Sequence, residues 1–241
     1  KTKPIVTGAN PTTNSIKITA TDEASEIIGY TITTTATIPT SFTSCTSTKA
    51  LNVTVGGKTQ GTTYYVWVKD QAGNISASKS TSTGKVADLT TGNTTFQYST
   101  KAWTNGNVTV TAKTTVTGFT LQTSKDGRTW NNTATQTLTA NGTVYARLWD
   151  GTNYGGAASG SVTNIDKTKP IVTGANPTTN SIKITATDEA SGIIGYAVTT
   201  STTTPTNFTS CSNTKALNVT VQNKTQGTTY YVWVKDQAGN I

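Results

Sequence analysis

Carboxylates are the side chains of this sequence best suited to chemistry, because its 241 residues include no histidine and no methionine. Adjacent acidic pairs occur at Asp22 and Glu23 and again at Asp188 and Glu189. The lack of histidine excludes Ser-His-Asp and Cys-His catalysis and the usual zinc ligand sets. A carboxylate pair needs a cleft to act in hydrolysis, and small β-sandwiches rarely supply one. We therefore expect no enzymatic activity and no organic cofactor.

A calcium site is the metal chemistry that these acidic residues could supply, because Ca²⁺ prefers oxygen ligands. The candidate ligands are Asp166, Asp188, Glu189 and Asp236. The alternative is that the same side chains form Asx turns and surface pairs with Lys167 and Lys169. The sequence leaves both interpretations open.

Aromatic residues provide a second candidate site. Tyr65 and Trp67, with their counterparts Tyr231 and Trp233, alternate with apolar residues and should therefore point outward from a strand. An exposed pair of this kind is a platform for a carbohydrate or a contact for a host protein. The alternative is that the rings pack across neighbouring strands and over lysine stems.

The element that carries these aromatic residues is the stretch 62–74, and it returns letter for letter at 228–240. Asp70 suits the first position of a type I turn, so a hairpin should follow. Before that turn, apolar residues alternate along the chain, which predicts a strand with one buried face formed by Tyr64, Val66 and Val68.

The sequence contains a long repeat. Residues 1–75 (the first copy) align without gaps with residues 167–241 (the second copy), and 64 of the 75 positions are identical. All 11 differences lie between positions 26 and 57 of the first copy. The intervening residues 86–165 (the middle segment) share the strand rhythm without close similarity. A fixed long period is typical of a tandem array.

Short strands separated by turns predict an all-β fold made of tandem β-sandwiches. A Thr-rich loop containing Pro39 is expected within the first copy. The expected inward residues of the first copy are Ile16, Ile18, Ala20, Ile28, Tyr30, Ile32, Leu51, Val53 and Val55. Those of the middle segment are Val108, Val110, Ala112, Val144, Ala146 and Leu148.

The sandwich explains how the acidic residues could meet. In such a fold the loop after the second strand, the loop after the sixth strand and the entering chain lie at one end. The four candidate ligands should therefore converge where the middle segment joins the second copy. A cation bound there would stiffen the joint.

Several stretches resemble known domains. Gly61-Thr-Thr-Tyr-Tyr-Val-Trp-Val68 resembles a strand of fibronectin type III and related bacterial immunoglobulin-like domains. Ile28-Gly-Tyr-Thr-Ile32 resembles their third strand, and Asp70-Gln-Ala-Gly-Asn74 resembles a loop of many Gram-positive surface repeats. In the middle segment, Trp103 and the run ending at Trp130 are similar to another immunoglobulin-like repeat of extracellular Firmicute proteins. The resemblance is specific for fold and says little about function.

The repeat and the strand rhythm of the middle segment predict three domains, at 1–85, 86–165 and 166–241. The first copy continues into residues 76–84, which should form the last strand of its sandwich. The third domain would lack that strand and expose a sheet edge, so we expect a longer parent protein.

A string of small sandwiches indicates a mechanical role, and together with this resemblance it predicts a spacer or stalk of a bacterial extracellular fibrous or adhesin-type protein, on the cell surface or secreted. One alternative is a module that binds a carbohydrate or a host protein. Another is a linker array of a secreted polysaccharide-degrading enzyme. The expected partners are neighbouring repeats of the same chain and, for the binding module, a host surface protein or glycan.

Charge, hydropathy and cysteine positions bear on nucleic-acid binding, membrane insertion and disulfide formation. The net charge is +8, from 19 basic and 11 acidic residues, and the lysines are scattered. Nucleic-acid binding needs a clustered basic face, so we expect none. We also expect no direct membrane insertion, because no apolar stretch is long enough to span a bilayer. Cys45 and Cys211 occupy equivalent positions of the two copies, which predicts half-buried, inert thiols and no disulfide within a copy.

Overall fold

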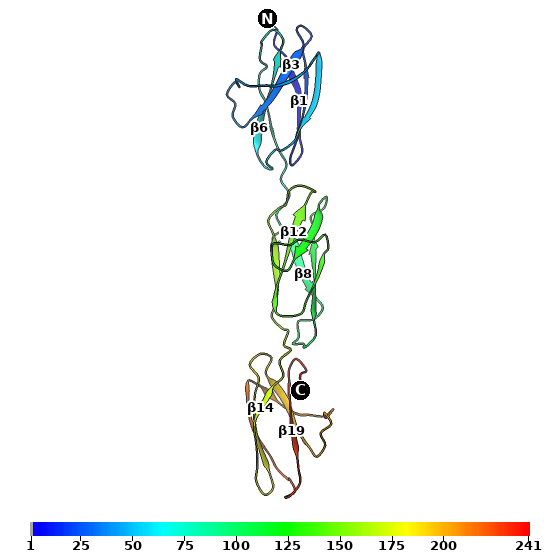
Figure 1. The fold of residues 1–241 in the computed structure, drawn as a ribbon, viewed down its shortest axis with the longest axis vertical. Helices are drawn as coiled ribbons and strands as arrows, with labels where there is room; N and C mark the ends of the chain where they lie inside the picture. The colour runs from blue at the N-terminus through cyan, green and yellow to red at the C-terminus, as the bar shows by residue number, and fades with distance from the viewer. Residues whose placement is uncertain (1) are drawn as a thin grey trace. The chain divides into compact units, whose positions relative to one another are not determined.

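The predicted all-β fold is confirmed. The computed structural model describes residues 2–241, and that part of the chain forms strands, turns and loops without a helix (Figure 1). Within residues 2–241 most strand pairings are antiparallel, and an isolated bridge between Thr104 and Ile165 is parallel. None of the described residues belongs to a helix long and apolar enough to cross a membrane.

The first copy and the residues that follow it form a two-layered sandwich. One sheet has the strand order β1-β2-β5 and the other has the order β4-β3-β6-β7. The strands are β1 (Ile5–Pro11), β2 (Ile16–Thr21), β3 (Ile27–Thr33), β4 (Thr43–Thr48), β5 (Ala50–Val55), β6 (Thr63–Asp70) and β7 (Lys79–Ser82). Side chains from both sheets meet in one buried cluster that contains Val6, Ile16, Ile18, Ala20, Ile27, Leu51, Tyr64, Val66 and Val68.

Two details of the first copy differ from the sequence expectation. A β-bulge between Ile27 and Gly29 shifts the register, so that Ile27 is fully buried and Ile28 is only half-buried. The extra residue of a bulge reverses which neighbouring side chains face the core. The second difference is β4, which forms where a loop was expected. Its side chains are exposed or half-buried, and therefore no apolar alternation marks it as a strand.

The middle segment forms two more small sheets, ordered β11-β9-β8 and β10-β12-β13. Its strands are β8 (Thr94–Tyr98), β9 (Val108–Thr114), β10 (Thr120–Ser124), β11 (Thr135–Leu138), β12 (Gly142–Trp149) and β13 (Ala158–Val162). The expected inward residues of β9 and β12 are buried. A second core cluster contains Val108, Val110, Leu138, Val144, Val162 and Ile165.

The second copy repeats the first sandwich around a third core cluster. Its strands are β14 (Ile171–Pro177), β15 (Ile182–Thr187), β16 (Ile193–Thr199), β17 (Thr209–Thr214), β18 (Ala216–Val221) and β19 (Tyr231–Asp236). The sheet orders are β14-β15-β18 and β17-β16-β19. Within residues 2–241, no strand pairs with the other edge of β19, the edge that corresponds to the β7 side of β6.

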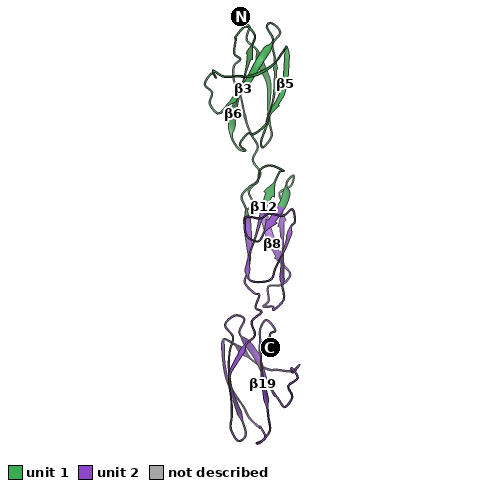
Figure 2. Ribbon diagram, viewed as in Figure 1, with its two compact units in different colours: residues 1–90, 116–121, 147–157 green, residues 91–115, 122–146, 158–241 purple. Residues whose placement is uncertain are grey.

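The chain divides into two compact units, coloured separately in Figure 2. The passage from the first copy to the middle segment lies inside the first unit. The passage from the middle segment to the second copy lies inside the second unit. The limits of the three domains at 85/86 and 165/166 stay a prediction. The first unit comprises residues 1–90, 116–121 and 147–157, and the second comprises 91–115, 122–146 and 158–241.

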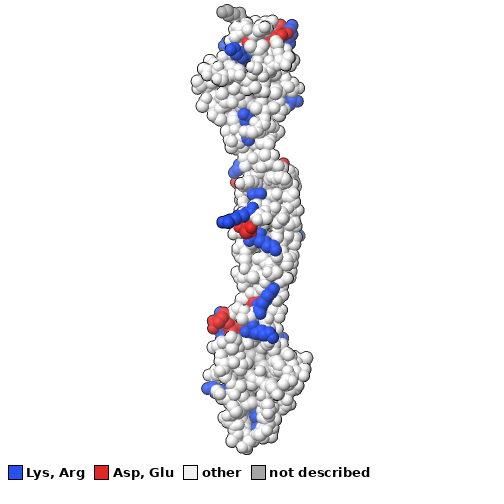
Figure 3. All heavy atoms as spheres, viewed as in Figure 1, with Lys and Arg blue, Asp and Glu red and all other residues white. Residues whose placement is uncertain are grey.

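The charged side chains do not gather into a basic patch on the face shown in Figure 3, where Lys and Arg are scattered among uncharged residues. This distribution agrees with the scattered lysines of the sequence. A nucleic-acid-binding surface would require such residues on one face.

Candidate metal centre

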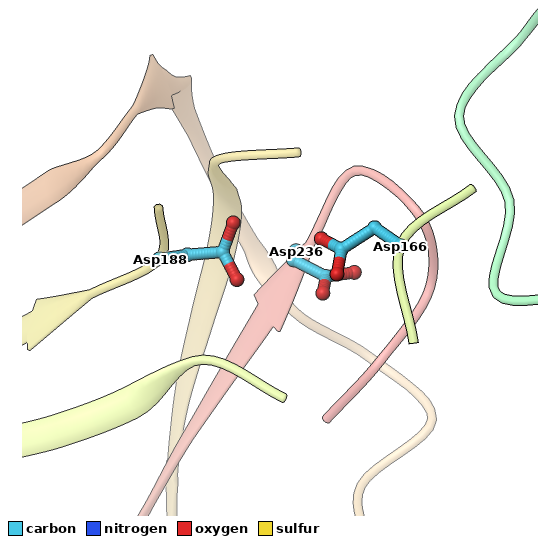
Figure 4. Close-up of side chains that lie close together, drawn as sticks. All are labelled: Asp166, Asp188 and Asp236. Carbon is cyan, nitrogen blue, oxygen red and sulfur yellow. The ribbon is translucent and has the colours of Figure 1, made fainter. Parts of the chain in front are cut away.

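Three aspartates converge where the middle segment joins the second copy. Asp166 lies in the connection, Asp188 directly follows β15, and Asp236 is the last residue of β19. Each offers a carboxylate oxygen, and these oxygens all lie within 4.8 Å of one another. Figure 4 shows the three side chains pointing toward a common region. The sequence therefore identified three members of this cluster, all in the second compact unit.

The cluster is shielded from solvent. Asp166, Asp188 and Asp236 are 3%, 4% and 0% exposed. No lysine or arginine nitrogen of residues 2–241 lies within salt-bridge distance of these carboxylates. Buried carboxylates need hydrogen bonds, a proton or a positive charge, because desolvation penalises the ionised form.

Main-chain amides provide part of that compensation for Asp166. Its Oδ1 accepts a hydrogen bond from the Thr168 amide at 2.9 Å, and its Oδ2 accepts one from the Ser191 amide at 3.0 Å. Asp166 thereby fixes the start of the second copy against the loop between β15 and β16.

Asp236 and Asp188 are held by their own loops. The backbone amide and the side-chain Nδ2 of Asn240 donate to Oδ1 and Oδ2 of Asp236, each at 2.7 Å. The Gly192 amide donates to Oδ1 of Asp188 at 2.6 Å. Oδ2 of Asp188 accepts no hydrogen bond from the described residues. The cluster thus retains one carboxylate oxygen available to a ligand.

Further hydrogen bonds tie the connection to both sides of the joint. The Asp166 amide donates to the Thr104 carbonyl at 2.9 Å. The Asn240 Nδ2 that contacts Asp236 also donates to the Asp166 carbonyl, at 3.0 Å. The Asn105 amide donates to the Ala238 carbonyl at 3.1 Å. Asp166 consequently lies in a connection that is hydrogen-bonded on both of its sides.

The electrostatic environment differs between two of the acids. Burial raises the pKa of Asp236 above its usual value, hydrogen bonds from Asn240 oppose the rise, and the negative charge of Asp166 adds to it. Burial acts in the same direction on Asp166, but hydrogen bonds from Ser191 and Thr168 outweigh it and lower the pKa of Asp166. A cation at this position would favour the ionised form of all three carboxylates.

The first copy provides a natural comparison. Asp22 and Asp70, the counterparts of Asp188 and Asp236, are also buried, and Asn74 donates to Asp70 with the same two 2.7 Å hydrogen bonds. Burial would raise the pKa of Asp70, but hydrogen bonds led by those of Asn74 lower it below the usual value. In the second copy, the third acid of the cluster is Asp166, which directly precedes the repeat.

The geometry is compatible with a bound Ca²⁺. Calcium–oxygen distances are about 2.3–2.6 Å, so two oxygens on one ion lie at most roughly 5 Å apart. The 4.8 Å limit within the cluster satisfies that condition. Three carboxylates supply fewer oxygens than the about six to eight that calcium takes, and main-chain carbonyls or water would have to complete the shell.

Glu189 is not part of the cluster. It is exposed, and its main-chain carbonyl accepts a hydrogen bond from Lys215 Nζ. The surface pair expected for Lys167 also differs, since its Nζ donates to Asn107 Oδ1 at 2.9 Å. Sequence reasoning did not single out Ser191 and Asn240. A local signal existed for Asn240, which lies four residues after Asp236 and donates its amide to that side chain. None existed for Ser191, because its amide donates to Asp166, 25 residues earlier in the chain.

The aromatic candidates occupy a less exposed face than expected. Trp67 is only 4% exposed, which corrects the expectation of an outward platform in the first copy. Its Nε1 donates to Thr33 Oγ1 at 3.1 Å. Tyr65 and Trp233 are half-buried, and Tyr231 is 38% exposed. Trp67 therefore packs within the sheet, as the alternative interpretation holds.

No family model matches the chain, and no curated protein matches it. Among solved structures, domains A168–A170 of titin align over 99% of this chain and 95% of their own, with 13% identity and a TM-score of 0.33. Three N-terminal domains of the Hoc capsid protein of bacteriophage RB49 cover 96% and 90%, with 16% identity and a TM-score of 0.37. The Escherichia coli adhesin FdeC covers 99% and 93%, with 12% identity and a TM-score of 0.36. The chain is similar to these proteins only at a level that carries no conclusion about function.

Proposed function

We propose that this chain is a structural spacer segment of an extracellular fibrous or adhesin-type protein, at a cell surface or secreted. In this role the sandwiches bear a distal part of the protein, and the joints between them resist bending. The repeat in the sequence supports an array, and the closed cores of the sandwiches support a structural role. Its partners are then the neighbouring repeats of the same chain.

The observation that carries the proposal is that both passages between repeats lie inside compact units. A flexible array would show few contacts at these places, because linkers between mobile domains cross few interactions. In the second unit, Asp166 joins Thr104 through its amide and Ser191 through its carboxylate. These bonds limit bending at that passage.

The first unit has a comparable set of contacts. Asn14 Nδ2 donates to Thr152 Oγ1 at 3.2 Å, and Gln60 Nε2 donates to the Tyr154 carbonyl at 3.1 Å. A further hydrogen bond connects Thr13 Oγ1 with Asp150 Oδ2. Loop residues of the first copy thus contact the loop after β12 through several polar side chains.

Calcium binding by Asp166, Asp188 and Asp236 is a second proposal that would reinforce the same role. It is favoured by the burial of three carboxylates and by the Asp188 oxygen that has no donor among residues 2–241. A cation shared by the connection and two loops would add ionic bonds across the joint. The competing interpretation is that amide hydrogen bonds alone maintain the cluster.

The alternative role as a carbohydrate- or host-protein-binding module has less support. Its best aromatic candidate, Trp67, is buried, Tyr65 and Trp233 are half-buried, and of the four only Tyr231 is exposed. A linker array in a secreted polysaccharide-degrading enzyme would use the same stiff joints. It stays a separate alternative, which a glycosidase domain elsewhere in the parent protein would favour.

Electron-spin distance measurements test the stiffness of the joint in the second unit. Spin labels replace Lys113 in β9 and Lys183 in β15, both exposed, in a variant whose Cys45 and Cys211 are serine. We expect a narrow distance distribution. Asp166→Ala should broaden it, because two amide hydrogen bonds across the connection are lost.

Asp126→Ala is the matched control. Asp126 Oδ1 also accepts from two following amides, Arg128 and Thr129, but it lies in a turn outside the joint. The control should leave the distribution unchanged. A wild-type distribution as broad as that of Asp166→Ala would refute the stiff spacer.

A further inference from the structure

The loop between β15 and β16 of the second copy, residues 188–192, is held by a side chain of β17. Asn213 Nδ2 donates to the Ser191 carbonyl at 3.0 Å and to Gln237 Oε1 at 2.5 Å. Gln237 lies in the loop after β19, and its amide donates to the Gly192 carbonyl at 2.9 Å. Asn213 therefore joins the β15–β16 loop to the loop that follows β19.

Ser191 is the residue through which the β15–β16 loop reaches the joint. It is 3% exposed, and its amide donates to Asp166 Oδ2 at 3.0 Å. Its hydroxyl accepts from the Ala238 amide at 3.3 Å, and the Ala238 carbonyl accepts from the amide of Asn105 in the middle segment. A displacement of Ser191 would therefore disturb hydrogen bonds to the connection and to a loop that contacts the middle segment.

Gly192 leaves room for Asn213. A Cβ built on Gly192 would lie 2.1 Å from Asn213 Oδ1, so a side chain at this position would have to displace the asparagine. Gly192 has a φ of +82°, but Glu26 has a similar φ of +63° at the equivalent position of the first copy. The contact with Asn213, more than the backbone conformation, consequently requires glycine here.

The first copy has a different pair of residues at the same two positions. Glu26 stands in place of Gly192, and Ser47 stands in place of Asn213. Ser47 Oγ donates to Glu26 Oε2 at 2.6 Å, which joins the corresponding loop to β4. Two of the 11 positions that differ between the copies thus lie against each other in both sandwiches.

We propose that Asn213 and Gly192 act as one positioning pair that fixes the Ser191 amide at the joint and thereby limits how far the joint can bend. This inference rests on the proposed function as a stiff spacer and adds the residues that determine the stiffness. Glu26 and Ser47 form the equivalent pair of the first copy. Each residue functions only with its own partner.

The two mixed combinations fail for different physical reasons. Gly192→Glu alone displaces Asn213, because the added side chain overlaps Asn213 Oδ1. Asn213→Ser alone loses the hydrogen bonds to Ser191 and Gln237, because serine lacks the amide group that makes them. The double variant Gly192→Glu with Asn213→Ser recreates the carboxylate–hydroxyl contact of the first copy.

Hydrogen exchange of the Ser191 amide, followed by NMR on the whole chain, tests the pair. Each single variant should accelerate this exchange about tenfold, because the loop loses one or two hydrogen bonds. The double variant should restore the rate to within about twofold of wild type. The amides of β15 should keep their protection throughout, and Asn213 is exposed, so Asn213→Ser should not unfold the copy.

Spin-label distances between positions 113 and 183 test whether the pair acts on the joint, in the same background without Cys45 and Cys211. Asn213→Ser should broaden the distance distribution, as Asp166→Ala does, and the double variant should narrow it again. Ser212→Thr is the matched control, because this exposed neighbour in β17 also differs from its counterpart, Thr46. It should change neither the exchange rate nor the distribution.

Three outcomes would overturn the inference. The first is unchanged exchange of the Ser191 amide in Asn213→Ser, and the second is exchange in the double variant as fast as in the single variants. The third is faster exchange without a broader distance distribution, because the pair would then support its loop alone. A broad distribution in the wild-type chain would instead refute the stiff spacer, and with it this role of the pair, whatever the exchange rates showed.

Discussion

The carboxylates of Asp166 and Asp236 lie within 4.8 Å of each other in a site where neither is more than 3% exposed. A single side-chain amide, Asn240 Nδ2, donates both to Asp236 Oδ2 and to the Asp166 carbonyl. Asn240 thus holds the carboxylates of Asp166 and Asp236 close together and also bonds the connection between the middle segment and the second copy. A change in the ionisation of these two carboxylates should therefore affect the geometry of that connection.

The pH dependence of stability should differ between the two copies. Because the pKa of Asp236 is raised in the fold, its contribution to stability decreases as the pH rises from 3.8, its usual value, through the raised value. Asp70 should behave oppositely, because its lowered pKa adds stability as the pH rises toward 3.8. NMR titration of both side chains and denaturation at several pH values measure these effects.

Two substitutions serve as controls for that pH dependence. Asp236→Asn should remove the decrease without affecting the first copy, and Asp70→Asn should remove the increase without affecting the second. Asp166→Ala should lower the pKa of Asp236, because it removes a neighbouring negative charge. Finding equal pKa values for Asp70 and Asp236 would contradict the electrostatic account.

Calcium should stabilise the second copy if the three carboxylates bind it. At a free calcium concentration near a hundred times the dissociation constant, the free energy of unfolding would rise by about 2.7 kcal/mol. Thermal denaturation with calcium and with chelator measures it, and NMR locates it. Asp188→Asn should abolish the gain, whereas Asp22→Asn, at the matching position of the first copy, should preserve it. Superimposable melting curves with calcium and with chelator would rule the site out.

The two equivalent tryptophans should make unequal contributions to stability. Trp67, in β6 of the sheet that contains β7, is 4% exposed, whereas Trp233 is half-buried. Trp67→Ala should therefore lower the free energy of unfolding by about 3–5 kcal/mol, and Trp233→Ala should lower it by less. Chemical denaturation measures both changes. If Trp67→Ala instead removed binding to a glycan array while preserving stability, the carbohydrate-binding alternative would be favoured.

Gly155 is required for a close approach in the first unit. A Cβ built on this residue would lie 2.1 Å from the carbonyl oxygen of Ala87. Gly155→Ala must displace the backbone and should lower the free energy of unfolding by about 1–3 kcal/mol. Gly56→Ala is the control, because no atom lies within 4 Å of the added carbon. Hydrogen exchange of the amides near Ala87 measures this loss of stability. Unchanged protection of these amides would show that the backbones of Gly155 and Ala87 have room for the added methyl group.

The two cysteines should react slowly and at similar rates. Burial raises the pKa of both thiols. Each Sγ donates to a carbonyl of the preceding strand, from Cys45 to Ile27 at 3.9 Å and from Cys211 to Ile193 at 3.8 Å. Because the thiolate is the reactive form, alkylation should be slow in the folded chain and accelerate in denaturant. Fast labelling of Cys45 alone would contradict the equivalence of the two sites.

Several elements of this fold could be predicted from local pattern. Alternating apolar residues predicted β2, β5, β6, β9 and β12, because a strand with one buried face has an apolar residue at every second position. β4 escaped prediction because neither of its faces is buried. The inward position of Ile27 escaped prediction because a bulge changes the register without changing the composition.

The sequence by itself determined the repeat, the strand periodicity and three of the acids that meet at the joint. It could do so because burial imposes a period of two on strands, and because a sandwich brings its loops together at fixed ends. Only the tertiary structure decided that Asp188 has an oxygen without a donor among residues 2–241 and that Trp67 and Trp233 differ in burial. Identical local sequences cannot distinguish their two environments. Those environments depend on contacts with residues outside the shared stretch, such as Asp166 beside Asp236 and β7 beside β6.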